Sequence, residues 1–202
     1  YVLATPDLFF FKDTDGDGRA DQKQVALTGF ASEYAPYRAD QLNMQALANS
    51  LRWGLDNRIH GAGSLSGGNL TSPLAGPINP VSLRGRDFAF DPRSRRVESE
   101  PGGGQYGLAF DDLGRRFTSN NSDHLRLFVY DPADLRPDAA SGFPPSLQSI
   151  ATDGPAAEVF RLSRDEPWRL VRTRWRVGGA VSGPIEGGGR SSGYFTSATG
   201  LM

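Results

Sequence analysis

The sequence predicts an all-β fold, and three features of the chain indicate it. Glycine and proline are frequent, with 25 and 14 residues in a chain of 202. The apolar runs between them are short, and turn-forming residues separate several pairs of runs, as in β-hairpins. Only residues 33–51 have a composition that suits a helix of any length, and Pro36 restricts that helix to the second half of the segment.

Four segments show the hairpin pattern, in which two strand-like runs flank a tight turn. They are residues 7–27 around an acidic loop, residues 49–63 with the turn at Asp56-Asn57, residues 86–99 with the turn at Asp91-Pro92, and residues 106–131 with a turn at 112–114 and a third strand from Leu125. We therefore expect strands through most of the chain.

The segment from Glu166 to Gly179 is the most basic part of the chain. Arg172, Arg174 and Arg176 alternate with other residues, and a period of two predicts a strand with one solvated face. Arginines interleaved with tryptophans are also typical of nucleic-acid binding. We prefer the strand, because it explains the alternation directly.

An internal repeat appears when residues 51–60 are aligned with residues 108–117. Leu51-Arg52-Trp53 then falls on residues 108–110, and His60 falls on Phe117. Repeated hairpins joined by Gly-rich loops predict a β-propeller, whose blades take roughly 40–50 residues each. We expect a segment of such a propeller, an incomplete ring of about four blades or fewer. It would be a single domain over residues 1–202, with repeat units at 1–63, 81–135 and 150–202. A β-sandwich is the alternative architecture.

Both ends of the sequence have the composition of strands. Tyr1 begins an apolar run, and the run before Met202, SGYFTSATGL, is rich in aromatic and β-branched residues. We expect a piece of a longer protein, in which the remainder of the propeller is a partner of this segment.

The charge and composition bear on the class of partner. A formal charge of −1 gives no general attraction to nucleic acid or to an anionic membrane. No apolar run is long enough for a direct membrane span. The chain has no cysteine, which excludes disulfides and thiolate metal sites within it. We therefore expect neither nucleic acid nor a bilayer-spanning segment.

The stretch KDTDGDGRAD has the spacing of a calcium loop. Asp13, Asp15, Asp17 and Asp21 stand at positions one, three, five and nine of such a loop, and a glycine stands at position six. The backbone carbonyl of Arg19 would supply position seven. Position twelve holds a glutamine and strand-like residues precede the loop, so the segment is not an EF-hand. We expect one structural calcium ion, and the alternative is a metal-free turn.

Several motifs resemble those of known propellers. GLAFDDLGRRFTSNNSDHLRLFVYD is similar to the NHL-type propeller repeat. DTDGDGRAD, NSLRWGLDNRIHGAG, LRGRDFAFDP, GGGQYGLAFDDLGRRFTSNNSDH and EGGGRSSGYFTSATG occur in this order and resemble the propeller of the large PVC-type membrane-bound dehydrogenase family. The resemblance covers nearly the whole chain. That family is similar to soluble glucose and sorbosone dehydrogenases, which are quinoproteins.

The resemblance implies a periplasmic or extracellular quinoprotein-like dehydrogenase that acts on an alcohol or a sugar. It implies pyrroloquinoline quinone as a cofactor, and a cytochrome c domain or chain as a partner. The alternative is a non-enzymatic NHL-type propeller that binds a ligand or another protein.

One of the two histidines is a candidate catalytic base. His124 lies in a loop between two predicted strands, where propellers project side chains toward the central channel. A quinoprotein dehydrogenase needs a base to take the hydroxyl proton as hydride leaves carbon. The alternative role of His124 is to hold its loop through a hydrogen bond. His60 lies on a predicted strand, and we expect it to be a packed structural residue.

Three arginines are candidates for binding an anionic cofactor. Arg84, Arg86 and Arg190 lie beside glycines, which let a ligand approach the backbone closely. Their guanidinium groups could each bind a carboxylate through two hydrogen bonds. The alternative is that they pair with neighbouring carboxylates, as Arg86 would with Asp87.

Overall fold

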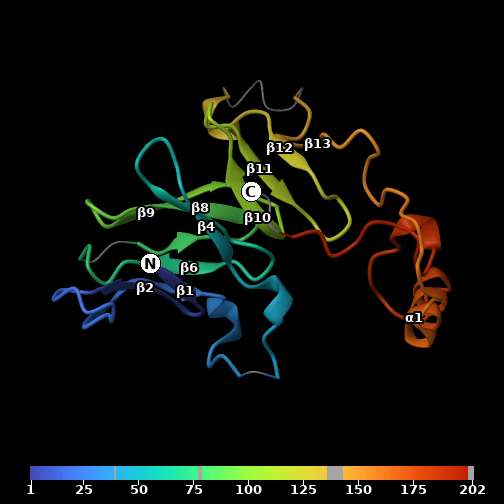
Figure 1. Cartoon of the computed structure of the whole chain (residues 1–202), viewed down its shortest axis with the longest axis horizontal. Coiled ribbons are helices and arrows are strands. Elements are labelled where there is room, and N and C mark those ends of the chain that lie inside the picture. Colours follow the sequence, from blue (N-terminus) through green and yellow to red (C-terminus); the bar gives the residue numbers. More distant parts are fainter. Residues whose placement is uncertain (39, 77–78, 136–142, 200–202) are drawn as a thin grey trace.

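The computed structural model describes residues 1–38, 40–76, 79–135 and 143–199. In these residues the regular structure consists mostly of three antiparallel sheets, and the one α-helix stands to the side of them (Figure 1). Each sheet is open, with two edge strands. The prediction of a mostly β fold is therefore confirmed.

The first sheet contains the N-terminal strands and has the order β1-β2-β3-β6-β7. Its strands are β1 (Val2–Ala4), β2 (Asp7–Lys12), β3 (Gln22–Phe30), β6 (Gly68–Thr71) and β7 (Val81–Ser82). The hairpin of β2 and β3 holds the acidic loop, as the sequence predicts.

The second and third sheets have four strands each, in the orders β4-β5-β8-β9 and β10-β11-β12-β13. Their strands are β4 (Asn49–Trp53), β5 (Ile59–Ala62), β8 (Arg86–Asp91), β9 (Arg96–Pro101), β10 (Tyr106–Phe110), β11 (Arg116–Ser119), β12 (Arg126–Phe128) and β13 (Leu147–Ser149). The chain leaves the second sheet after β5, adds β6 and β7 to the first sheet, and returns at β8. This excursion ties the first two sheets together.

The strands confirm the internal repeat. The number of residues from the start of β4 to the start of β10 equals the number from the start of β5 to the start of β11. The turn that joins β4 to β5 and the turn that joins β10 to β11 also have the same structure. In each turn the first residue, Gly54 or Asp111, donates its backbone N–H to the carbonyl four residues later. Asn57 and Gly114 occupy matching positions with φ angles of 60° and 76°, a conformation that asparagine and glycine tolerate best.

The first and second sheets pack through an apolar interface. On β8, Phe88 and Phe90 are almost completely buried, and Phe88 packs edge-on against Phe30 of β3, with ring centroids 5.2 Å apart. The other buried members of this core are Leu8, Ala26, Leu27, Ile59, Leu70 and Leu83. Because strand residues alternate between faces, Asp87 and Ala89 of β8 point the other way, toward the third sheet.

The segment predicted as a basic strand is an α-helix, α1, which spans Pro167–Val177. Proline fits the first turn of a helix because its missing N–H costs no hydrogen bond there, and Gly178 follows the last turn. Trp168, Val171 and Trp175 recur at helical spacing. The prediction of a strand was wrong because the local alternation of arginines is a weaker signal than these.

Where it is described, the segment expected to contain a helix forms short 3-10 turns, η1 (Ser32–Tyr34) and η2 (Met44–Ala46). Later described residues form the 3-10 turns η3 (Pro132–Asp134) and η5 (Gly187–Gly189). The side chain of Asn43 caps η2 by accepting the backbone N–H of Gln45, and the chain becomes extended again at Leu47.

The strand predicted near the end of the chain is also absent from the described residues. Up to Thr199, the run SGYFTSATGL forms a single bridge, between Tyr194 and Glu158. It packs instead on the loop after β11, where the backbone N–H of Ala198 donates to the carbonyl of Asn121. The last residues of the run, from position 200, lie outside the described residues.

Candidate functional site

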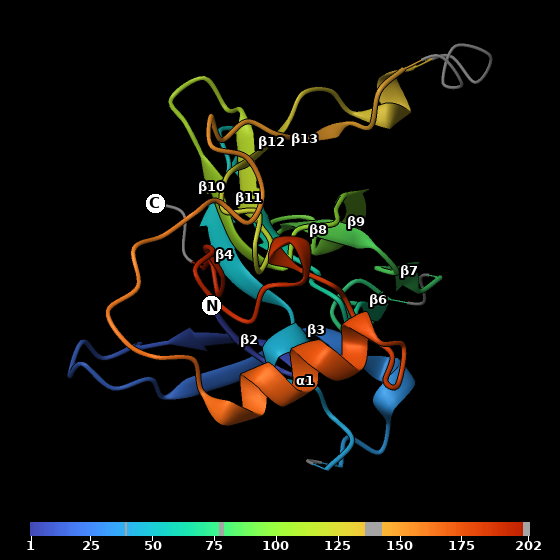
Figure 2. The same ribbon diagram turned by 90° about the vertical axis from the view of Figure 1, so that its right-hand side faces the viewer.

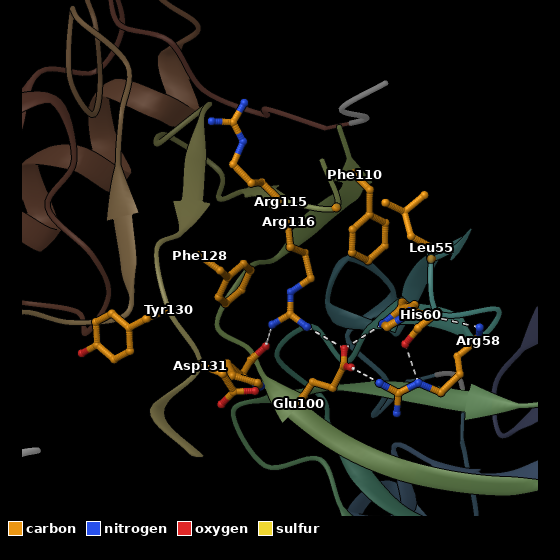
Figure 3. Close-up of a pocket in the computed structure, with 14 residues that line it drawn as sticks. Leu55, Arg58, His60, Glu100, Phe110, Arg115, Arg116, Phe128, Tyr130 and Asp131 are labelled. Carbon is orange, nitrogen blue, oxygen red and sulfur yellow. Dashed lines mark hydrogen bonds and ion pairs between the residues drawn. The ribbon is translucent and has the colours of Figure 1, made fainter. Parts of the chain in front are cut away.

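A cleft of about 370 Å³ lies between the second and third sheets. Side chains from β5, β9 and β11 meet inside it, and the two matching turns of the repeat stand at its rim. The residues around it are Gly54, Leu55, Asp56, Arg58, His60, Glu100, Pro101, Phe110, Gly114, Arg115, Arg116, Phe128, Tyr130 and Asp131. Figure 3 shows Arg58, His60, Glu100 and Arg116 pointing toward one another, whereas Arg115 points away from them.

Arg116 holds the centre of the cleft. It starts β11 opposite Phe110 of β10, and its guanidinium lies 4.0 Å from the centre of the Phe128 ring. Its Nη1 donates to Oε2 of Glu100 at 2.6 Å, and its Nη2 donates to the carbonyl of Pro101. Glu100 and Pro101 end β9, so this side chain ties the third sheet to the second (Figure 3).

His60 lies on β5 with its imidazole between two carboxylates. Its Nδ1 is 2.9 Å from Oε2 of Glu100, and its Nε2 is 3.1 Å from Oδ1 of Asp56. The residue is 5% exposed, and its ring packs edge-on against Phe110. A Cβ at Gly54 would lie 2.5 Å from Nε2, so this turn needs glycine at that position.

The contacts of His60 favour the charged forms of the cluster. Burial lowers the pKa of His60, but hydrogen bonds and charges from Glu100 and Asp56 outweigh it, so the pKa is raised. Burial raises the pKa of Glu100, but His60 and Arg116 reverse the effect and lower it. Partial burial also raises the pKa of Asp56, but hydrogen bonds from His60 and Arg58 outweigh this effect and lower the pKa to about 2. The geometry is that of an imidazolium donating from both nitrogens.

Asp87 lies behind this cluster, opposite Glu100 on the neighbouring strand. It is 1% exposed, and its Oδ1 accepts the backbone N–H of Gly63 at 3.0 Å. Its Oδ2 has no hydrogen-bond partner among the described residues. Burial raises the pKa of this carboxyl to about 7, against the opposing charge of Arg116. Asp87 therefore titrates near neutral pH, unlike Asp56.

The cleft can hold a ligand, but its histidine is not placed to act as a base. Both nitrogens of His60 contact carboxylates, so neither offers a lone pair to a ligand. A general base must reach the proton that it removes. The groups open to a ligand are the aromatic rings of Phe110 and Phe128 and the rim, where Leu55 and Arg115 are exposed.

The predicted base, His124, lies outside this cleft, in the loop between β11 and β12. Its Nε2 is 3.3 Å from Oδ1 of Asp153, and its ring lies 4.8 Å from that of Phe195. Its Nδ1 is shielded from solvent and has no hydrogen-bond partner among the described residues. The structure therefore gives His124 a carboxylate partner that the sequence analysis did not predict.

The three candidate arginines lie in two different places. Arg84 is exposed just before β8, and Arg86 begins that strand, with its Nη2 donating to the carbonyl of Ser99 at 3.3 Å. Arg190 follows η5, and its Nη1 pairs with Oε1 of Glu158 at 2.9 Å. In the described part of the chain, no hydrogen bond or ion pair joins any of them to a histidine.

The acidic loop brings three of its carboxylates together. One oxygen from each of Asp13, Asp15 and Asp21 lies within 4.8 Å of the others, and all three residues are exposed. Asp13 accepts the backbone N–H groups of Gly16 and Gly18, and these hydrogen bonds lower its pKa. Hard oxygen donors in this arrangement suit a calcium ion.

The other predicted ligands of the loop are arranged differently. Asp17 stands apart from the group of three in the described residues, and its Oδ1 accepts the backbone N–H of Arg19 at 2.8 Å. Gln24, at position twelve, lies in β3 opposite Phe10. The carbonyl of Arg19 and the carboxylate of Asp17 stay predicted ligands of a calcium ion, as do the three clustered aspartates.

A family model described as a domain of unknown function, DUF7133, matches residues 1–202. The chain belongs to the DUF7133 family. No curated protein and no solved structure matches this DUF7133 chain.

Sequence reasoning missed the charged cluster of the DUF7133 cleft. Its members are spread over the chain, with His60 and Glu100 40 residues apart and Arg116 on the next sheet. One local signal was present, because Asp56 lies in a tight turn and His60 follows four residues later on the next strand, so the two side chains can approach each other.

Proposed function

We propose that the three sheets are successive blades of a β-propeller and that the chain forms an arc of the ring. The third sheet pairs its strands in chain order, as a propeller blade does, and the second sheet has the same number of strands. Their first strands, β4 and β10, are in contact and are related by the internal repeat. In this arrangement β6 and β7 are an addition to the first blade.

We further propose that the protein is a quinoprotein-like dehydrogenase, periplasmic or extracellular, that acts on an alcohol or a sugar. The observation that carries this proposal is the pair of His124 and Asp153. A carboxylate on one imidazole nitrogen orients the ring and leaves the other nitrogen to act as the base. Nδ1 of His124 would take the substrate's hydroxyl proton after the residues around it, Phe195 among them, rearrange.

Pyrroloquinoline quinone would accept the hydride in such an enzyme. The candidate arginines do not fit a clamp for this quinone, because Arg86 and Arg190 are engaged elsewhere and lie apart from each other. We therefore assign no residue of this chain to the quinone. The role that we assign to calcium is structural, in the hairpin of β2 and β3.

The test is the rate of dye reduction by the native protein with calcium, the quinone and an alcohol or sugar substrate. His124→Gln should lower kcat by about 10²–10⁴-fold, the typical effect of losing a general base. Asp153→Asn should cause a smaller loss, because it removes only the group that orients the ring. Equal turnover in wild type and His124→Gln would exclude this role.

The second candidate is a binding module without catalysis, an NHL-type propeller. The observation that favours it is the cleft between the second and third sheets, in which the charged groups pair with one another and the aromatic walls remain open. A native protein that binds a ligand in this cleft and reduces no dye would support the module.

A further inference from the structure

We propose that α1 binds the protein to the surface of an anionic lipid membrane. This inference goes beyond the proposed function, because it concerns attachment and not chemistry. It rests on the charge of one segment, on the exposed face of its helix and on the place of that helix in the molecule.

Positive charge is concentrated in the segment that contains α1. Residues 159–181 hold six arginines and two carboxylates, a formal charge of +4 in a chain whose total is −1. The rest of the chain is therefore acidic, and the net charge hides the contrast. Attraction to an anionic surface depends on such local charge, which acts over about one Debye length, roughly 8 Å at physiological salt.

The exposed face of α1 is apolar. Trp168, Val171 and Trp175 are spaced to lie on one side of the helix and are 51%, 41% and 54% exposed. Arg172 and Arg174 lie on either side of this stripe, and the guanidinium of Arg172 is 4.6 Å from the Trp168 ring. Tryptophan prefers the interface between lipid and water, and arginine there reaches the phosphates.

The opposite side of α1 is the one that contacts the protein. Arg176 reaches the carbonyl of Pro184 with its Nη1, and η5 packs against the helix. Figure 1 shows α1 standing apart from the three sheets, and in Figure 2, which is seen from that side, the helix lies in front of the first sheet. Beside it in sequence, Phe160 and Leu162 are 90% and 94% exposed. The apolar face is thus presented outward on a projecting element.

The other possible occupants fit this face less well. A second copy would bring two equally basic helices together, which costs electrostatic energy. A nucleic acid would contact arginines on the outermost face, but that position is held by Trp168 and Trp175. No helix among the described residues has the length and apolarity needed to cross a bilayer. A basic amphipathic helix lying in the membrane plane fits the observations best.

The experiment is sedimentation of the purified protein with vesicles of phosphatidylglycerol and phosphatidylcholine in equal amounts, and with vesicles of phosphatidylcholine alone. The wild type should bind the anionic vesicles, with a blue shift of tryptophan fluorescence and weaker binding at high salt. The double variant Trp168→Ala/Trp175→Ala should lose the binding. The double variant Arg172→Gln/Arg174→Gln should bind the anionic vesicles more weakly, on the order of tenfold, because each arginine near an anionic surface adds electrostatic attraction to the lipid phosphates.

The matched control is Trp53→Ala, because Trp53 is 62% exposed on β4, away from the helix. This variant should bind as the wild type does, and circular dichroism should show that all variants are folded. Equal binding to neutral vesicles, or undiminished binding of the double tryptophan variant, would overturn the proposal. So would a wild type that binds no vesicles, whether it binds DNA, dimerises through α1 or does neither.

Discussion

His60 separates the carboxylates of Asp56 and Glu100 at the junction of the second and third sheets, and its charge makes folding depend on pH. The pKa of His60 is raised above the ordinary value of 6.5. The folded state therefore holds the proton more tightly than the unfolded chain does. Its contribution to stability is complete below pH 6.5 and is lost as the pH rises through the folded-state pKa.

We predict that the melting temperature falls as the pH rises from neutral toward 9, and that His60→Gln flattens this fall. The variant is less stable at every pH, but it has no proton to lose in that range. The pKa of Asp87 is raised to about 7 in the folded state. Stability therefore also falls as the pH rises between the unfolded-state pKa and the folded-state pKa of this carboxyl, which is a lower pH range than that of His60. Thermal unfolding across the pH range measures both effects. The control is His124→Gln, and a slope equal to that of the wild type in His60→Gln would contradict the prediction.

Single residues also show how far the sequence could lead. The spacing of the acidic loop indicated a group of carboxylates, and three of its aspartates do converge. Position in the repeat suggested a packed His60, and the residue is buried. The sequence could not indicate that its partners are Glu100 and Asp56, because Glu100 comes from β9, which lies two strands from β5 in the sheet and is reached only after β6 and β7. Contacts between residues that are far apart in the sequence depend on the order of the strands in the sheet.

The hairpin of β2 and β3 is the element on which calcium should act. Three exposed carboxylates within a few ångströms repel one another, and a bound cation would remove that repulsion. An ion that binds only the folded state stabilises it by mass action. We predict that a chelator lowers the melting temperature and that Asp15→Ala removes the response to the chelator.

The control for this prediction is Asp91→Ala, in the turn between β8 and β9. Asp91 also accepts hydrogen bonds from its own turn, but it stands outside the acidic loop. This variant should keep the response to the chelator. An unchanged melting curve of the wild type after chelation would mean that the loop is a metal-free turn.

Elements with a long-range pattern could be predicted, and elements with competing patterns could not. The repeat located β4, β5, β10 and β11, because the same turn chemistry recurs at a fixed distance. In α1 the arginines recur with the period of a strand, whereas the tryptophans recur with the period of a helix. The proline and the glycine at the two ends of the segment favour the helix. The addition of β6 and β7 to the first sheet could not be predicted, since short strands carry little pattern.

At the scale of the whole molecule, the two sheet junctions differ in chemistry. The first and second sheets share an apolar core, whereas the second and third sheets meet through Glu100 and Arg116, whose side chains are 14% and 11% exposed. Without Arg116, Glu100 would keep His60 at 2.9 Å and Arg58 at 3.5 Å, but it would lose the hydrogen bond from Arg116, and the carbonyl of Pro101 would lose its donor. The third sheet would therefore lose a charged link to the second.

We predict that Arg116→Ala lowers the free energy of unfolding by about 2–3 kcal/mol, because a hydrogen bond to a charged group typically contributes about 1.5–3 kcal/mol. The control is Arg38→Ala, whose pair with Asp40 is 63% and 65% exposed and should contribute about 1 kcal/mol or less. Urea unfolding measures both. Similar small losses in the two variants would mean that the junction does not depend on the charged pair.

The most direct test of the proposed function is the absorbance spectrum of the native protein before and after addition of an alcohol or sugar substrate. A quinoprotein-like dehydrogenase should show quinone absorption that changes on reduction by substrate, and His124→Gln should suppress the change while leaving the fold intact. A native spectrum with protein absorption alone, in a protein that binds a ligand without turnover, would contradict the enzyme and support the binding module.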